Sequence, residues 1–206
     1  MYPRTENVAV PEINEWLFPK QTVILISGKA GVGKSTAAKF IFSYLSPKIC
    51  RYVRISRFAE GVKQVARIMS WDGEKGQQGR KLLQDIGNLG RWYDQDAWVK
   101  AMIYMLQEEM PASDVIIVDD WRFPNEVKYF DERPELFLVY TVRIHGEGRE
   151  SLKGTKEYRD VSETSLDRYK TFDYHIINHD NVSIEEFHDT IVDVVRDIIS
   201  KSKLGI

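Results

Sequence analysis

The sequence has few of the residues from which disulfides and zinc sites are built. Its single cysteine, Cys50, cannot form an internal disulfide or supply a zinc site made of several cysteines. The four histidines show no pairing typical of a zinc-protease helix, and a lone histidine is more often a surface or packing residue than a metal ligand. We therefore expect neither zinc chemistry nor stabilisation by disulfides.

Long hydrophobic runs and an excess of positive charge are also lacking. No apolar stretch approaches the roughly 20 residues needed to span a bilayer, and the N-terminus shows no apolar core typical of a signal peptide. The formal net charge is −2, which gives no sign of a nucleic acid as the partner. We expect a cytoplasmic protein that contacts neither membrane nor nucleic acid, and a homodimer is compatible with the sequence.

What the sequence does contain is sufficient for one folded domain. It has 206 residues, and 43% of them are hydrophobic, a share typical of a globular protein with a core. Residues 1–20 carry prolines between short polar stretches, and we interpret them as an extension. A single domain is predicted over residues 21–206.

Short β-branched runs alternate with stretches of helical periodicity along this domain. The predicted strands are 22–27, 50–56, 114–120, 136–144 and 173–178. The predicted helices are 35–45, a segment around 62–69, 78–90, 95–109 and a last helix from residue 183. Because such alternation is typical of a parallel sheet covered on both faces, we predict an α/β three-layer sandwich with a mainly parallel sheet.

The strongest motif is the glycine-rich segment 28–36, GKAGVGKST, which fits the P-loop pattern GxxxxGK[ST] without a mismatch. Its backbone N–H groups can wrap a phosphate chain, and the N-terminus of the following helix adds partial positive charge. Lys34 can reach the β- and γ-phosphates, and the Ser35 hydroxyl can coordinate Mg²⁺. We expect ATP or GTP with Mg²⁺ to bind here rather than a glycine turn that binds nothing. The expected contacts are Lys29, Ala30, Gly31, Val32, Gly33, Lys34, Ser35 and Thr36.

Two adjacent carboxylates, Asp119 and Asp120, end the apolar run that begins at residue 114. Ligands gather at the carboxyl ends of parallel strands, so a carboxylate there can hold Mg²⁺ beside Ser35. Side chains alternate along a strand, and Asp120 would share its side with Arg122. We therefore expect Ser35 and Asp120 to bind the metal, and Lys34, Asp120 and Arg122 to form the catalytic set. The alternative is that both acids only cap the next helix.

Two further segments are candidates for binding the acceptor and for closing over the site. The helical insert over residues 57–110 presents Arg80, Gln84 and Asn88 four residues apart on one face, which offers a cation for a phosphate and amides for a base. The charged, glycine-bearing segment 145–168 is either a lid or an ordinary solvated loop. As a lid, it would bring three cations over the transferring phosphoryl group: Arg149, Lys153 and Arg159.

The chain resembles the deoxynucleoside monophosphate kinases of bacteriophages, within the nucleoside monophosphate kinase class. The segments that carry the resemblance are RFAEGVK at 57–63, RKLLQDIGN at 80–88, DQDAWVKAM at 94–102, DDWRFPNE at 119–126, VSET at 161–164 and IINHDNVSIEEF at 176–187. The resemblance implies phosphoryl transfer from ATP to a (deoxy)nucleoside monophosphate, with Asn178 near the ATP base. It also implies an acceptor site formed by Lys63, Arg80, Lys81, Gln84, Gly87, Asn88 and Trp98.

Two other functions fit the same motifs. One is a P-loop kinase that acts on another small phosphorylated metabolite, and the other is a nucleic-acid-associated P-loop ATPase. The acceptor oxygen of a monophosphate is already ionised, so a monophosphate kinase needs positioned cations rather than a strong general base. The sequence favours such a kinase, with a P-loop sandwich, a helical acceptor-binding insert and a short lid.

Overall fold

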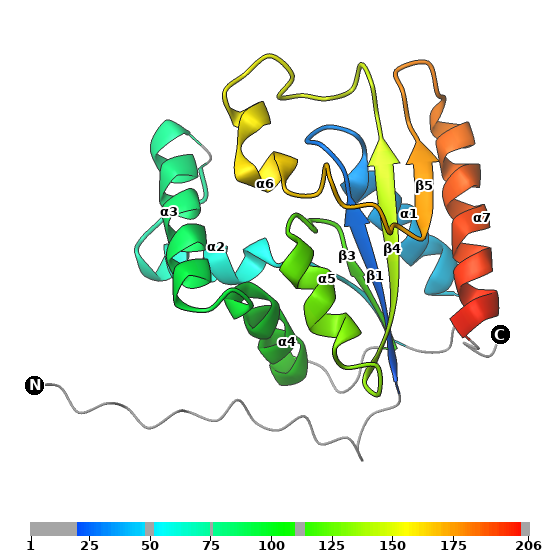
Figure 1. Cartoon of the computed structure of the whole chain (residues 1–206), viewed down its shortest axis with the longest axis horizontal. Helices are drawn as coiled ribbons and strands as arrows, with labels where there is room; N and C mark the ends of the chain where they lie inside the picture. Colours follow the sequence, from blue (N-terminus) through cyan, green and yellow to red (C-terminus); the bar gives the residue numbers. More distant parts are fainter. Residues whose placement is uncertain (1–19, 48–51, 75, 110–113, 203–206) are drawn as a thin grey trace, which may run out of the picture.

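The middle layer of the molecule is a parallel sheet whose strands run in the order β2-β3-β1-β4-β5 (Figure 1). The structure is a computed structural model, and it describes residues 20–47, 52–74, 76–109 and 114–202. The strands are β1 (Gln21–Ser27), β2 (Val53–Ser56), β3 (Val115–Val118), β4 (Phe137–His145) and β5 (Tyr174–Ile177). All four neighbouring pairs are parallel, which confirms the predicted sheet.

Helices follow most of the strands. They are α1 (Lys34–Leu45), α2 (Ala59–Ile68), α3 (Gln77–Tyr93), α4 (Ala97–Glu109), α5 (Pro124–Asp131), α6 (Val161–Thr164) and α7 (Ile184–Ser202), with a 3-10 helix η1 (Glu157–Arg159). The sequence pattern did not predict α5 and α6, which are short. Residues 1–19 of the predicted extension and residues 50–51 of the second predicted strand lie outside the described residues.

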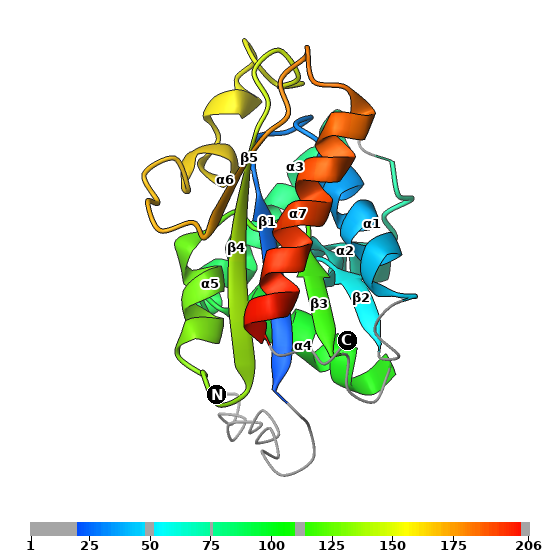
Figure 2. The ribbon, with the colours of Figure 1, turned by 90° about the vertical axis from the view of Figure 1, so that its right-hand side faces the viewer.

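The helices form a layer on each face of the sheet, as predicted. Ile24 and Ile26 of β1 point into a core shared with α1 and α7, whereas Val23 and Leu25 point into a second core with α2, α4 and α5. The four side chains are fully buried, and burial of one such side chain contributes about 1.5–3 kcal/mol. Figure 2 shows α7 and α1 together on the first face.

The strand order brings three loops to one edge of the sheet. β1 lies between β3 and β4, so the carboxyl ends of these three strands are neighbours. The P-loop follows β1, the two aspartates follow β3, and the segment towards α6 follows β4. In open α/β sheets this edge is where ligands bind.

No helix among the described residues is long and apolar enough to span a membrane.

Candidate active site

The P-loop connects β1 to α1 through glycines that no other residue could replace without strain. Gly31 and Gly33 have φ angles of 91° and 99°, in the left-handed region. A Cβ atom on Gly31 would lie 2.3 Å from the Arg149 carbonyl oxygen, and one on Gly33 would lie 2.7 Å from the Asn178 Nδ2 atom. The loop is therefore fitted closely between α1, the segment after β4 and the segment after β5.

Asn178, which follows β5, holds the P-loop through a hydrogen bond to its backbone. Its side chain is buried, and Nδ2 donates a hydrogen bond to the Val32 carbonyl at 2.9 Å. Its backbone N–H donates to the His145 carbonyl at 2.6 Å. In the structure the Asn178 amide nitrogen contacts the P-loop backbone, and the place near the ATP base that the resemblance implies stays a prediction.

Lys34 begins α1 and lies among several charges. Its Nζ atom donates hydrogen bonds to the carbonyls of Gly28 at 2.8 Å and Lys29 at 2.7 Å. Burial and the nearby Arg122 lower the pKa of Lys34 to about 8, although the carboxylates of Glu163 and Asp119 act in the opposite direction. Arg122, which follows β3, is thus part of the charged surroundings of Lys34.

Asp119, not Asp120, faces the P-loop. Its carboxylate is buried and is hydrogen-bonded to the Ser35 side chain. Burial alone would raise the pKa of Asp119, but the hydrogen bonds from Arg57 and Ser35 outweigh it and hold the pKa below its ordinary value. Asp119 continues the side of β3 that faces α1, and α1 carries Ser35 at its start.

The expectation that Asp120 faces the P-loop is therefore wrong in its geometry. The Asp120 carboxylate accepts the backbone N–H groups of Phe58 at 3.0 Å and Ala59 at 2.9 Å, where α2 begins. Burial raises its pKa, and these two hydrogen bonds lower it only in part. Asp120 lies on the α2 side of the strand end because side chains alternate, and there it holds the start of α2.

Arg57 is a site residue that the sequence analysis did not single out. It follows β2 directly, and its guanidinium binds Asp119 with two hydrogen bonds, from Nε to Oδ1 at 2.6 Å and from Nη2 to Oδ2 at 2.8 Å. Its side chain is 43% exposed, although the carboxylate that it binds is buried. The sequence feature that could have identified Arg57 is its place directly after a predicted strand.

Glu163 is a second residue that the sequence analysis missed. Its Oε2 atom accepts the backbone N–H of Ala30 in the P-loop at 2.9 Å, and its Oε1 atom forms an ion pair with Arg122. The Arg122 guanidinium also donates to the Ser162 carbonyl at 3.2 Å. Helix α6 thus contacts both the P-loop and the segment after β3.

A pocket of about 640 Å³ lies beside these groups, between α3 and the start of α5. Asp120 and Arg122 line it together with residues 160–162 before and within α6. Most of the predicted acceptor residues also line it, namely Lys63, Lys81, Gln84, Gly87, Asn88 and Trp98. Arg80, one helical turn before Gln84 in α3, is not among the lining residues.

Both lysines that line the pocket form ion pairs on their own helices. Lys63 pairs with Glu60 at 3.1 Å, and Lys81 pairs with Asp85. Trp98 forms one side of the pocket and packs closely on α3. Its Nε1 atom donates to the Gly87 carbonyl at 2.9 Å, and a Cβ atom on Gly90 would lie 2.4 Å from its ring. These contacts fix the shape of the pocket.

Arg91 is the cation of this pocket that the sequence analysis left out of the site. Its guanidinium carbon lies 4.5 Å from the centre of the Phe123 ring, and its Nη2 atom donates to the Asn88 side chain at 3.2 Å. Burial lowers its pKa, against the charges of Glu126 and Asp160. Gly87 makes room for it, because a Cβ atom there would lie 3.0 Å from Nη2.

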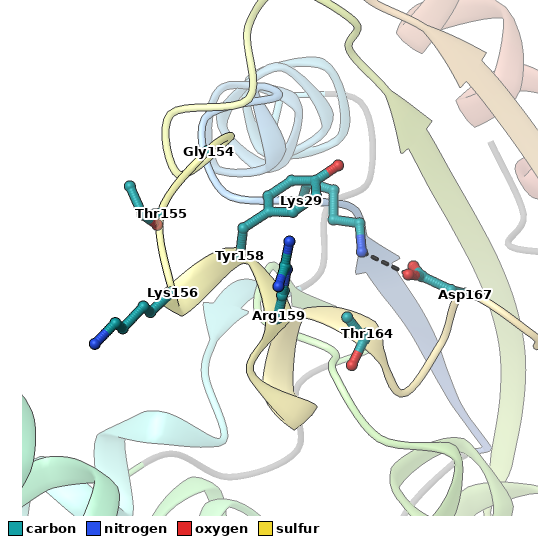
Figure 3. A pocket seen from close by; sticks show the side chains of 8 residues that line it. All are labelled: Lys29, Gly154, Thr155, Lys156, Tyr158, Arg159, Thr164 and Asp167. Carbon is teal, nitrogen blue, oxygen red and sulfur yellow. Dashed lines mark hydrogen bonds and ion pairs between the residues drawn. The ribbon is translucent and has the colours of Figure 1, made fainter.

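The three predicted lid cations lie in different places. Arg159 lines a second pocket, of about 580 Å³, and Figure 3 shows it beside Tyr158 and near Lys29. Lys29 itself is tied to this segment by hydrogen bonds to Asp167 at 2.7 Å and to the Glu163 carbonyl at 2.6 Å. Arg149 turns instead to the carbonyls of His179 and Val182, at 2.8 and 2.7 Å, and Lys153 pairs with Glu150 at 3.6 Å.

Comparison with known proteins gives similarities of fold only. No protein-family model matches the chain, and no curated protein matches its sequence. Among solved structures, an APS kinase of Mycobacterium tuberculosis in complex with AMPPNP and APS is 14% identical, with a TM-score of 0.46 over 86% of this chain and 99% of that chain. A shikimate kinase of Aquifex aeolicus is 17% identical, with a TM-score of 0.44 over 85% and 96%. A gluconokinase of Sinorhizobium meliloti is 15% identical, with a TM-score of 0.42 over 90% and 98%. Similarities of this size decide nothing about the chemistry of the chain.

Proposed function

We propose that this protein transfers the γ-phosphoryl group of ATP to a (deoxy)nucleoside monophosphate. The observation that carries the proposal is the place of Arg122. Arg122 pairs with Glu163, whose other oxygen accepts the Ala30 N–H of the P-loop, and Arg122 also lines the neighbouring pocket of about 640 Å³. A cation shared by a phosphate-binding loop and a neighbouring pocket is what transfer between two phosphorylated substrates requires.

The chemistry of the pocket supports a phosphorylated acceptor with a base. Arg91 and Arg122 both line the pocket, and Arg91 lies over the ring of Phe123, the residue that follows Arg122, so both offer a positive charge to a phosphate. Further along α3, the amides of Gln84 and Asn88 line the same pocket and offer both donors and acceptors to a base edge. We assign the phosphate to the two arginines and the base to the two amides.

The residues beside the P-loop fit a magnesium ion. Mg²⁺ prefers hard oxygen ligands and keeps several waters, so it needs few protein ligands. The Ser35 hydroxyl and the Asp119 carboxylate lie in contact, and their oxygens would hold the ion together with nucleotide phosphates. When bound, Mg²⁺ would neutralise charge on the β- and γ-phosphates. No group of three or more His, Cys, Asp or Glu side chains in the described segments is arranged as a metal site.

The chain's own groups would carry the transfer by position and charge. An ionised oxygen of the acceptor phosphate forms a bond to the γ-phosphorus while the bond to the β-phosphate oxygen breaks, so ADP leaves without a protein base. Lys34 would exchange its two carbonyl acceptors for phosphate oxygens, and Arg122 would stabilise charge on the transferring group. Arg57 would keep Asp119 ionised and oriented.

An assay of ADP release with every common ribo- and deoxyribonucleoside monophosphate tests the proposal. We expect release that depends on one or a few monophosphates and yields the matching diphosphate. ATP hydrolysis without an acceptor should be slow, and DNA or RNA should not stimulate it. Transfer to a phosphorylated metabolite that is not a nucleotide, or hydrolysis stimulated by nucleic acid, would replace this function by one of the two other functions considered above.

A further inference from the structure

We propose that Glu163 is a positioning residue that holds Arg122 against the P-loop for phosphoryl transfer. The proposal rests on the proposed function, because it assigns Glu163 a role in that reaction. It acts through Arg122 and does not require contact between Glu163 and either substrate.

The two oxygens of Glu163 join two parts of the site that are far apart in sequence. Oε2 accepts the backbone N–H of Ala30 at 2.9 Å, and Oε1 pairs with Nη1 of Arg122. The Glu163 side chain is 4% exposed, and a buried carboxylate persists only where such donors satisfy it. The carboxylate therefore sets the distance between the P-loop backbone and the Arg122 guanidinium.

The place of Glu163 is itself fixed. The Asp160 side chain accepts the backbone N–H of Ser162 at 2.8 Å and caps the first turn of α6. The Glu163 carbonyl accepts a hydrogen bond from Lys29 Nζ at 2.6 Å, which adds a second contact with the P-loop. Helix α6 thus cannot shift without breaking contacts to Lys29 and Ala30.

Arg122 has a long and partly exposed side chain, and Glu163 provides its ion pair. Its side chain is 33% exposed, and a long arginine side chain loses substantial rotamer entropy when it is held in one place. A negative charge near the transferring phosphoryl group would oppose catalysis if it acted directly, since like charges repel. The benefit of Glu163 must therefore come from the orientation of Arg122, and not from its own charge.

Glu163→Gln tests this with little change of volume. Ala30 N–H and Arg122 meet different oxygens of Glu163, so in the amide one of these two donors faces an NH₂ group that cannot accept. We expect kcat to fall by about 10- to 100-fold, as for a displaced positioning group, with KM for ATP changed less than about threefold. Glu150→Gln is the matched control, because this carboxylate is bound by Lys153 and Tyr158 and not by Arg122.

A double variant separates positioning from a general structural role. In an Arg122→Lys background the orientation is already lost, so adding Glu163→Gln should lower kcat by less than about twofold. Independent, multiplicative losses would overturn the proposal, as would an unchanged kcat in Glu163→Gln. If that variant does not fold, Glu163→Asp, which retains the charge but has a shorter reach, carries the same expectation.

Crystal structures distinguish this proposal from the proposed function. In Glu163→Gln the Arg122 guanidinium should leave the position that it has in the wild type, whereas in Glu150→Gln it should remain. If the wild-type protein transfers phosphate to no monophosphate, the proposed function fails by itself, and these structures alone decide the positioning. An unmoved Arg122 in Glu163→Gln would overturn it.

Discussion

The Ser35 side chain is hydrogen-bonded to the Asp119 carboxylate, and this contact joins the start of α1 to the end of β3. Arg57 binds the same carboxylate from the end of β2, so three elements meet at one buried acid. The hydrogen bonds from Arg57 and Ser35 hold the Asp119 pKa below its ordinary value despite burial. Asp119 is thus an ionised group held in a fixed position beside the P-loop.

The first prediction separates the two adjacent aspartates. Asp119→Asn should lower kcat at least about 100-fold and weaken the dependence on Mg²⁺, because it removes a charge from the proposed metal site. Asp120→Asn should mainly cost stability, about 1–3 kcal/mol, because an amide oxygen and NH₂ cannot satisfy both the Phe58 and Ala59 N–H groups. Turnover at varied Mg²⁺, together with urea unfolding, measures both effects. A larger loss of kcat in Asp120→Asn than in Asp119→Asn would assign the metal to Asp120.

The second prediction concerns Lys34. Lys34→Ala should lower phosphoryl transfer at least about 100-fold, because a charge that stabilises the transition state is lost. Folding should not suffer, since burial opposes the Lys34 charge and lowers its pKa to about 8. The folded wild type therefore binds fewer protons than the unfolded chain between about pH 8 and 10.5, and its stability should rise with pH across that window. The variant should lack this rise, which thermal unfolding at several pH values can detect.

Much of the fold could be predicted because its signals are local. The buried β-branched runs of β1 and β3 and the glycines after β1 specify a strand, a P-loop and a helix without reference to distant residues. The short helix α6 escaped prediction because four residues give too little periodicity. Asp160 caps α6, but an aspartate indicates the start of a helix only where the end of the preceding loop is already known.

The site was harder to predict because its residues come from separate strands. The alternation of side chains was used correctly for Asp119 and Asp120, but the sequence does not say which face of β3 carries α1. The structure answers this, because Val115 and Ile117 pack in the α1 core and Asp119 continues their side. Glu163 and Arg57 were missed for the same reason, since their partners are Ala30, Arg122 and Asp119 on other elements.

The third prediction is a pH dependence of stability that comes from Glu126. One oxygen of this buried acid accepts the backbone N–H groups of Arg122 and Phe123, at 2.8 and 3.0 Å, and burial raises its pKa from 4.5 to about 8. The folded state therefore holds the proton more tightly than the unfolded chain. The stability from Glu126 is complete below pH 4.5 and is lost as the pH rises through 8, by at most about 1.4 kcal/mol per pH unit.

Glu126→Gln should remove this loss, because its amide oxygen can accept both hydrogen bonds and it cannot ionise. The free energy of unfolding in urea, measured from pH 5 to 8, should fall with pH in the wild type more steeply than in the variant. Glu132→Gln, at the exposed end of α5, is the control and should keep the wild-type slope. Equal slopes in all three proteins would mean that Glu126 is ionised in the folded state at neutral pH.

The last prediction tests the acceptor site through Arg91. Its guanidinium lies over the Phe123 ring in the pocket that Arg122 also lines, so we expect it to bind the acceptor's phosphate. Arg91→Ala should raise KM about tenfold or more for every monophosphate alike, since all carry the same phosphate, while KM for ATP changes little.

Two further variants show whether charge or shape matters and whether the effect is local. Arg91→Lys should recover only part of the loss, because an ammonium group cannot stack on Phe123 or bind a phosphate with two parallel hydrogen bonds. Arg80→Ala removes an arginine of the same helix that does not line the pocket, and its acceptor KM should stay within about twofold of the wild type. If Arg91→Ala instead reorders the preferred monophosphates without a common rise in KM, the guanidinium meets the base. The acceptor then lies in the pocket in the opposite direction, with its phosphate towards Lys63 and Lys81.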